Sequence, residues 1–414
     1  MTQACPVPGP NQHGGDGSPL ERALVGLLSV SPGMKPGDLG PAVREAGAHL
    51  GGRATTLLLV DLAQRWLYPM GGGHEEGGDR LPVDASPAGE AFRSESPVQE
   101  PTGDGTRLWV PILDSAERVG VLGTTLDEVG SVALRHWAVL GALVGELVVT
   151  KSRYGDAPVM VRRTRPVTLA AEMRWALLPP LTFTSADVMI SAILEPAYQV
   201  AGDAFDYAVN GNVAHVALFD AMGHGLEASR MANLVVGSYR HNRRRGEDLP
   251  ACVAAMDAAI EEQFGDCRFV TGQVATLDLG SGVLSAINAG HPPPVVFHPD
   301  GTADELQCAR VLPLGLGAAP SEPVDTKLRE GDVILFHTDG IAEARTAAGE
   351  FFGSDRLQRL VGELLAARLR PAEVLRRVVA AVLAYQPRLR DDATLLLLGW
   401  QLGEQALPPA LRLP

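Results

Sequence analysis

The stretch from Asp203 to Asp220 constrains the fold of this chain more than any other. Two runs of alternating apolar and polar residues flank Asn210-Gly211, the strongest short-range signal for a β-hairpin. With Asn210-Gly211 as a two-residue loop, Asp203 would lie opposite Leu218, and Asp220 would be its diagonal neighbour, roughly 7–8 Å away. Both acids are therefore expected at the open end of the hairpin.

Side-chain alternation separates Asp203 from Asp206, three residues later. Asp203 falls on the face that carries Phe205, Tyr207 and Leu218, whereas Asp206 points to the opposite face. The pattern selects Asp203, and not Asp206, for a site shared with other acids. A three-residue loop would reverse that choice.

Two further acids or acid pairs border apolar runs. Val333–Phe336 is followed by His337-Thr338-Asp339, and Asp391-Asp392 precedes a run of leucines. Taken singly, each acid is more often a turn residue or a helix cap. Carboxylate oxygens are the ligands that hard divalent cations prefer, so acids from four strand ends together favour a metal site.

Composition narrows the class of protein. A chain of 414 residues is long for one core and favours two domains. Its net charge of −14 argues against a nucleic-acid partner, which normally needs a basic surface. The four cysteines, Cys5, Cys252, Cys267 and Cys308, are scattered, which favours free thiols and a cytoplasmic protein.

The sequence gives no reason to expect a membrane protein. The N-terminus lacks the basic start and apolar stretch of a signal peptide. The longest apolar run, Trp137–Thr150, contains Glu146 and is short of the roughly 20 residues that cross a bilayer.

The pattern along the chain predicts an ordered sequence of segments. A polar tail precedes an α/β domain, a basic linker leads into an amphipathic helix with Leu169, Met173 and Leu177 on one face, and strands followed by long helices complete the chain. The expected boundaries are a tail at 1–18, a domain at 19–150, the linker at 151–183, a second domain at 184–402 and a tail at 403–414.

A set of motifs in the second domain resembles a known family. They are G-D-A-F-D (202–206), D-A-M-G-H-G (220–225), T-G-Q-V-A-T-L-D (271–278), N-A-G-H-P-P-P (288–294), H-T-D-G-I-A-E-A (337–344), F-F-G (351–353) and D-D-A-T (391–394). In this order they resemble SpoIIE/RsbU-type serine phosphatases, a bacterial branch of the protein phosphatase 2C-like (PPM) superfamily. The resemblance implies an α+β fold, with two antiparallel sheets between helices in a four-layer α-β-β-α sandwich.

The resemblance also implies a site with two Mn²⁺ or Mg²⁺ ions. Its metal ligands would be Asp203, Asp220, Asp339 and Asp391, together with the carbonyl of Ala221; Asp392 is the second choice of its pair. Asp220 would bridge the ions and belong to the catalytic centre. All these acids are present, so an active enzyme is expected.

Two histidines have open roles. His224, or a metal-bound water, could protonate the serine leaving group, but a structural role for His224 at a tight turn is the simpler interpretation. His291 is similarly ambiguous.

The first domain resembles a GAF sensor domain through loose motifs around Pro87–Phe92, Leu108–Leu113 and Gly120–Gly123. Such domains bind small ligands or dimerise, so an unknown small ligand and a homodimer are expected. Residues 19–150 contain no cysteine, which excludes thioether attachment of a chromophore.

The predicted function is a regulated protein serine/threonine phosphatase. By analogy with the family, its substrate would be a phosphorylated anti-anti-sigma protein of the STAS type. The alternatives are a scaffold driven by the GAF-like domain, a small-molecule phosphatase and, against the acidic charge, a nuclease.

Overall fold

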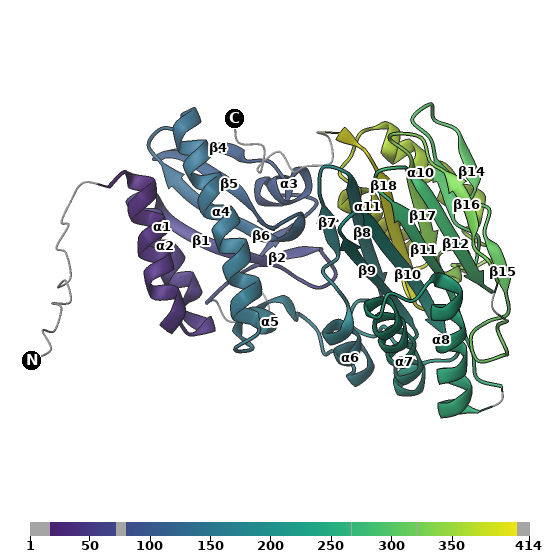
Figure 1. The fold of residues 1–414 in the computed structure, drawn as a ribbon. Helices are drawn as coiled ribbons and strands as arrows, with labels where there is room; N and C mark the ends of the chain where they lie inside the picture. Colours follow the sequence, from purple (N-terminus) through teal and green to yellow (C-terminus); the bar gives the residue numbers. More distant parts are fainter. Residues whose placement is uncertain (1–16, 72–79, 266, 320, 404–414) are drawn as a thin grey trace, which may run out of the picture.

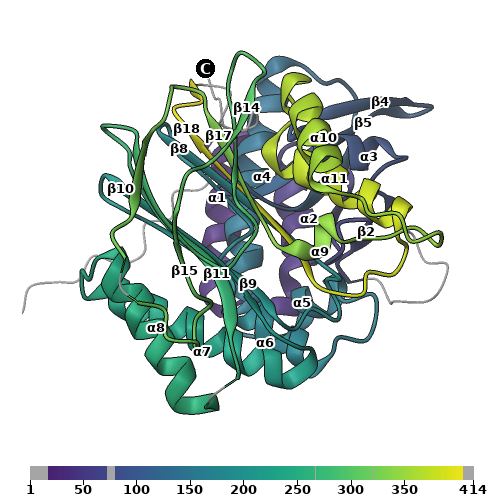
Figure 2. The same ribbon diagram turned by 90° about the vertical axis from the view of Figure 1, so that its right-hand side faces the viewer.

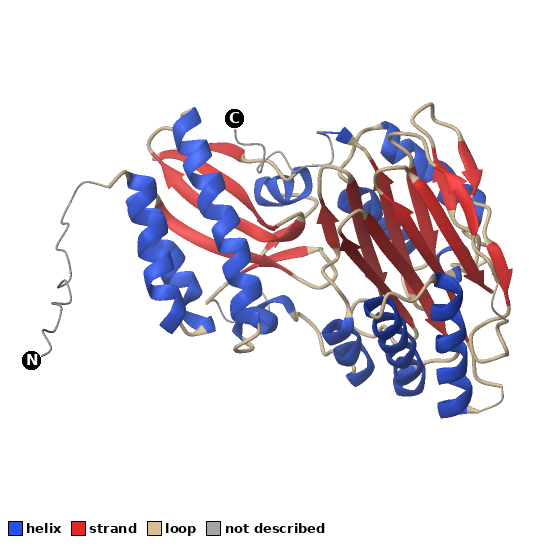
Figure 3. Ribbon diagram, viewed as in Figure 1, coloured by secondary structure: helices blue, strands red, loops and turns tan. Residues whose placement is uncertain are grey.

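The computed structural model describes residues 17–71, 80–265, 267–319 and 321–403. Apart from Gly17, Ser18 and Gly403, the two expected tails lie outside these ranges, as does Cys5. An N-terminal domain and a C-terminal domain lie side by side, joined by a helical connector (Figure 1), and both combine helices with sheets (Figure 3).

The N-terminal domain is built on one antiparallel sheet. Its order is β3-β2-β1-β6-β5-β4. The strands are β1 (Arg53–Val60), β2 (Trp66–Pro69), β3 (Leu81–Pro82), β4 (Val98–Thr102), β5 (Gly105–Asp114) and β6 (Glu117–Leu126). One face is covered by α1 (Pro19–Val30), α2 (Leu39–His49) and α4 (Ser131–Ser152), and the other by α3 (Pro87–Ser94).

Helix α4 is longer than the apolar run expected from the sequence. Within the described residues it alone has the length and apolar composition to cross a membrane. Trp137, Leu140 and Val144 on this helix are fully buried in the N-terminal core. Such packing is also what the core helix of a globular domain shows.

The connector contains α5 (Ala157–Arg162) and α6 (Leu169–Leu177). The expected apolar face of α6 is only partly covered, since Leu169 is 63% exposed whereas Leu177 packs against an apolar cluster of the C-terminal domain. Ala171 and Arg174 are fully buried, and Arg174 turns inward to make hydrogen bonds within the C-terminal domain.

The C-terminal domain contains two sheets. The first has the order β15-β12-β11-β10-β9, with β16 also paired to β12, and the second has the order β14-β13-β17-β18-β8-β7. The first sheet contains β9 (Asp203–Asn210), β10 (Val213–Ala221), β11 (Val270–Asp278), β12 (Val283–Ala289), β15 (Ala309–Val311) and β16 (Val324–Lys327). The second contains β7 (Thr182–Thr184), β8 (Val188–Glu195), β13 (Val295–Phe297), β14 (Ala303–Glu305), β17 (Val333–His337) and β18 (Ala393–Trp400). All pairs are antiparallel except β12 with β15.

Three apolar clusters hold four layers together. Inward-facing side chains of the two sheets form the central cluster. Helices α7 (Gly225–Arg244) and α8 (Leu249–Phe264) pack on the first sheet, and α10 (Ser354–Ala366) and α11 (Pro371–Tyr385) pack on the second, as Figure 2 shows. The short helix α9 (Asp339–Ala342) follows β17. The predicted α-β-β-α sandwich is confirmed.

The hairpin register differs from the expected one by two residues. Asn210 pairs with Val213, so the loop is Gly211-Asn212, and Gly211 adopts a φ of +58°, which glycine tolerates without strain. Asp203 therefore lies opposite Asp220, and not opposite Leu218. A shift of two residues leaves every side chain on its predicted face, because the side-chain period of a strand is two.

The two domains meet through charged side chains. Arg118 of β6 forms an ion pair of 3.4 Å with Glu373 of α11, and both side chains are 3% exposed. Arg376 of α11 reaches Asp84 of the N-terminal domain at 2.5 Å. The carboxylate of Glu117 accepts a hydrogen bond of 2.8 Å from the backbone N–H of Thr182.

Candidate metal centre

Asp203 and Asp220 face each other across the open end of the β9–β10 hairpin. They are Cα partners in the ladder, and their carboxyl groups are close enough to interact directly. A side chain at Gly202 would not fit, since an added Cβ would lie 2.6 Å from the carbonyl oxygen of Ala221. The predicted ligands Asp203, Asp220 and Ala221 are thus adjacent.

The carboxylate of Asp203 has one satisfied and one unsatisfied oxygen. Oδ2 accepts hydrogen bonds from the hydroxyls of Thr338 at 2.9 Å and Thr394 at 2.6 Å. Oδ1 is buried and has no hydrogen-bond partner among the described residues. An unpaired buried acceptor is costly, so this oxygen is positioned for a ligand that the protein itself does not supply.

Asp339, which follows strand β17 of the second sheet, lies next to this pair. The hydroxyl of Thr338, which donates to Asp203, also accepts a hydrogen bond from the backbone N–H of Thr394 at 2.9 Å. A Cβ at Gly340 would clash with the carbonyl oxygen of Asp392, so α9 packs directly on the chain that enters β18. The tight packing places Asp339 beside the acids at 391–392.

Asp391 and Asp392 have different environments. Oδ2 of Asp392 accepts backbone hydrogen bonds from Ala201 (2.7 Å), Gly202 (2.7 Å) and Asp203 (3.2 Å). Asp392 therefore holds the chain that leads into β9, whereas Asp391 is exposed. Because Asp392 is held by these three backbone hydrogen bonds, Asp391 remains the predicted ligand of the pair.

The crowding of carboxyl groups raises several pKa values. Burial, followed by Asp339 and Asp391, raises the pKa of Asp220 to about 7. Burial, followed by Asp220 and Asp392, holds the pKa of Asp203 well above its usual range. Burial and then Asp391 raise the pKa of Asp339. A divalent cation among these groups would offset their repulsion.

The residues fit a divalent metal in donor chemistry. Only carboxylate and carbonyl oxygens are offered, as Mg²⁺ and Mn²⁺ prefer. Within the described ranges no three His, Cys, Asp or Glu side chains are already close enough to form a metal-binding group. The acids are neighbours at one end of the two sheets, and their side chains would have to move closer together to hold a cation.

The two histidines differ in their surroundings. His224 is exposed at the N-terminus of α7, where its side chain makes no capping hydrogen bond. His291 is buried, and its Nδ1 is 2.8 Å from Oγ1 of Thr271. Burial, followed by His337, lowers the pKa of His291 to about 3, so its ring is neutral. These surroundings favour a structural role for His291.

Arg174 holds the chain that leads to Asp203, and the sequence did not indicate this role. It lies on α6 and donates hydrogen bonds to the carbonyl of Ala201 at 2.8 Å and to Asn233 at 3.1 Å. Burial lowers its pKa to about 10, so it stays charged at neutral pH. Thr338 and Thr394 were also missed, although both lie inside the quoted motifs.

Asp206 is separate from the centre, as predicted. Its carboxylate pairs with Arg240 and Arg243 of α7, each at 2.6 Å. These two arginines thus neutralise a buried acid on the outer face of β9.

Two antiparallel sheets between helix layers, with carboxylates from both sheets gathered at one end, define the fold of the PPM class. The family model described as Stage II sporulation protein E (SpoIIE) matches residues 210–401. The match covers most of the C-terminal domain, which is therefore similar to this family. Asp203 lies just outside the matched residues, and the structure places it opposite Asp220.

Two named proteins and one solved structure are similar to part of this chain. Phosphoserine phosphatase RsbU of Bacillus subtilis (strain 168) is 25% identical over 235 residues, covering 56% of this chain and 69% of RsbU. Protein IcfG of Synechocystis sp. is 24% identical over 221 residues, covering 45% of this chain and 34% of IcfG. The solved RsbU and RsbW domains of Rv1364c from Mycobacterium tuberculosis align at 26% identity with a TM-score of 0.46, over 53% of this chain and 62% of that one.

Proposed function

We propose that this chain is a metal-dependent protein phosphatase that hydrolyses phosphoserine or phosphothreonine on a regulatory protein. The observation that carries the proposal is the unpartnered Oδ1 of Asp203, which lies opposite Asp220 in a group of carboxylates with raised pKa values. The similarity to a phosphoserine phosphatase supports the substrate class.

The chain's own residues would prepare a site for two Mn²⁺ or Mg²⁺ ions. When bound, such ions activate water and hold phosphate oxygens for in-line attack. Asp203, Asp220, Asp339, Asp391 and the carbonyl of Ala221 would hold them, with Asp220 between the two. Thr338 and Thr394 fix one oxygen of Asp203 so that the other is presented to the metal.

The leaving serine oxygen must gain a proton. His224 follows Asp220 by four residues and is exposed, so its ring is accessible to a bound substrate. We assign it as the candidate donor, with a metal-bound water as the alternative. A fall in kcat for His224→Ala at low pH, with metal affinity unchanged, would support that role.

The N-terminal domain, which resembles a GAF sensor, would regulate this activity. The domain contacts α11 and β7 through charged side chains, so a ligand that changes the N-terminal domain can alter its contacts with the phosphatase domain. A STAS-type anti-anti-sigma protein is the proposed substrate, in the cytoplasm. A homodimer is part of the same proposal.

The test is Mn²⁺-dependent hydrolysis of a generic phosphoester and of a phosphoserine protein. Asp220→Asn and Asp339→Asn should lose activity, whereas the matched control Asp355→Asn, at an exposed position on α10, should keep it. Activity on the phosphoester alone would favour a small-molecule phosphatase. An inactive wild type at saturating Mn²⁺ would favour a scaffold, and full activity in both site variants would contradict the proposal.

A further inference from the structure

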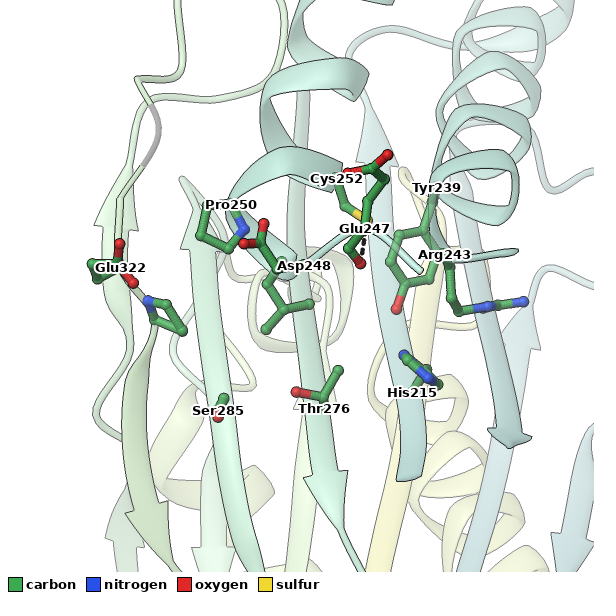
Figure 4. A pocket seen from close by; sticks show the side chains of 12 residues that line it. His215, Tyr239, Arg243, Glu247, Asp248, Pro250, Cys252, Thr276, Ser285 and Glu322 are labelled. Atoms are coloured by element: carbon green, nitrogen blue, oxygen red, sulfur yellow. Dashed lines mark hydrogen bonds between the residues drawn. The ribbon is translucent and has the colours of Figure 1, made fainter. Parts of the chain in front are cut away.

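Helix α11 ends close to two acids of the carboxylate centre. Its last residue, Tyr385, lies shortly before Asp391 in the sequence, and Gln386 is its C-cap. The hollow beside α7 and α8 (Figure 4), in contrast, is lined by residues that do not belong to the centre. Contacts at the end of α11 can therefore act on the metal site.

Gln386 uses both ends of its side-chain amide. Its Oε1 accepts a hydrogen bond from the backbone N–H of Arg345, and its Nε2 donates to the backbone carbonyl of Arg388 at 2.8 Å. The residue is buried, with 9% of its surface exposed. One buried side chain thus joins the segment after α9 to the segment before β18.

Helix α11 gives Gln386 a fixed base. The backbone N–H of Gln386 donates to the carbonyl of Val382 at 2.7 Å. Val378 and Val382 are buried in the apolar cluster between this helix and the second sheet. A side chain held at its base and at both polar ends can fix the distance between the segments that it joins.

The first segment is tied to Asp339 by one helical turn. Asp339 begins α9, and its backbone carbonyl accepts a hydrogen bond of 2.8 Å from the N–H of Glu343. Ile341 and Ala344 of the same segment are buried in the apolar cluster that α11 covers. A shift of the backbone at Arg345 would therefore move the turn that carries Asp339.

The second segment holds Asp391 between two anchors. On one side, the carboxylate of Asp392 is bonded to three backbone N–H groups. On the other side, the carbonyl of Arg388 is bonded to Gln386. These two anchors determine where the backbone of Asp391 lies.

The carboxylates of Asp339 and Asp391 are close enough to repel each other. While no cation is bound, this repulsion favours separation of the two segments. The amide of Gln386 resists the separation, because each of its ends is bonded to one segment.

We propose that Gln386 is a positioning residue that sets the separation of the backbone segments carrying Asp339 and Asp391. Its role rests on the proposed function, whose metal centre it would serve. Mg²⁺ requires near-ideal octahedral geometry at roughly 2.0–2.1 Å, whereas Ca²⁺ accepts more flexible geometry at roughly 2.3–2.6 Å. A fixed separation of the acids therefore favours Mg²⁺ over Ca²⁺.

Calorimetric titrations of Mg²⁺ and of Ca²⁺ into the full chain compare wild type with Gln386→Met. Methionine has a similar length and volume but lacks the amide, so the variant should fold while losing both hydrogen bonds. We expect the affinity for Mg²⁺ to fall roughly 10–100-fold, as for other groups that orient metal ligands. The affinity for Ca²⁺ should fall by a smaller factor, and its retention shows that the variant is folded.

The matched control is Tyr385→Phe, which removes a hydrogen bond of 3.0 Å from the same helix end to the carbonyl of Phe351. The ring still packs on Phe352, with centroids 5.5 Å apart, so the variant should bind both ions as wild type does. The proposal is overturned if Gln386→Met keeps the wild-type affinity for Mg²⁺, if both ions lose affinity equally, or if Tyr385→Phe loses as much.

The same titrations separate this role from the proposed function. A wild type that binds neither ion would overturn both. A wild type that binds Mg²⁺ but hydrolyses no phosphoester would contradict only the phosphatase reaction, because the role of Gln386 is decided by the ratio of the two affinities.

Discussion

Arg118 and Glu373 join the two domains through an ion pair of 3.4 Å whose partners are each 3% exposed. Glu373 also accepts hydrogen bonds from Arg376 at 2.8 Å and Arg377 at 3.0 Å. Burial lowers the pKa of Arg118, and Glu373 is the largest of the charges that raise it again. While the domains are in contact, the buried charge of Arg118 therefore depends on Glu373 to offset its desolvation.

Removing one partner of this pair should open the junction. Glu373→Gln leaves Arg118 buried without its closest anion, and we expect a loss of about 3 kcal/mol in the free energy of unfolding, measured with urea. Cleavage by a protease within the connector at residues 163–168 should accelerate. The double variant Arg118→Met/Glu373→Gln should recover part of the loss, whereas strictly additive losses would show that the two residues are not coupled.

Glu117 should make the stability of the chain depend on pH. Burial is the main cause that raises its pKa to about 7. The folded state then holds a proton that the unfolded state releases near pH 4.3, so the contribution of Glu117 to stability falls as the pH rises from about 4.3 to 7. Glu117→Gln lacks this titration and can still accept the hydrogen bond from Thr182.

The measurement is urea unfolding of wild type and Glu117→Gln between pH 5 and pH 8. Between pH 5 and pH 8, the free energy of unfolding of the variant should rise by about 1–2 kcal/mol relative to that of the wild type. A constant difference between the two proteins would show that Glu117 is already ionised in the folded state at pH 5.

Arg174→Met should weaken the metal centre from a distance. The variant loses the hydrogen bond to the carbonyl of Ala201, whose backbone N–H is held by Asp392. Outer groups that orient metal ligands typically contribute roughly 10–100-fold in affinity, so the Mn²⁺ concentration for half-maximal activity should rise by about that factor. The maximal rate at saturating Mn²⁺ should change little, and a lost maximal rate with unchanged Mn²⁺ dependence would contradict this role.

The sandwich was expected from the resemblance of the ordered motifs to a known family, whereas the gathering of acids was predicted from short-range patterns in the sequence. Alternation along 203–220 assigned Asp203 and Asp206 to opposite faces, and this assignment survived a two-residue error in register. The error arose because a glycine with positive φ fits the first loop position as well as the second. Local propensity does not distinguish the two loops.

Long-range partners could not be predicted in the same way. The inward turn of Arg174 depends on Ala201 and Asn233, which lie far away in sequence. The pairing of Asp206 with Arg240 and Arg243 joins a strand to a helix, and nothing local in the sequence identifies these residues as partners. The domain junction likewise joins residues separated by about two-thirds of the chain.

Asp206 and Asp203 should respond to the same substitution in opposite ways. Asp206→Asn leaves Arg240 and Arg243 without their anion and should cost about 3–5 kcal/mol in stability, measured by urea unfolding without metal. Burial and neighbouring acids raise the pKa of Asp203, so its charge is unfavourable in the metal-free fold. The free energy of unfolding of Asp203→Asn without metal at pH 7 should therefore not fall below that of wild type. A large loss for Asp203→Asn would mean that its charge stabilises the metal-free fold.

Calorimetric titration of Mn²⁺ into wild type and Asp203→Asn tests the central claim most directly. The account predicts saturable binding to wild type and a loss of affinity in Asp203→Asn that exceeds the roughly 10–100-fold effect of a group that only supports a ligand. Asp355→Asn should bind as wild type does. Equal Mn²⁺ affinity in wild type and Asp203→Asn would contradict the assignment of these acids as a metal centre.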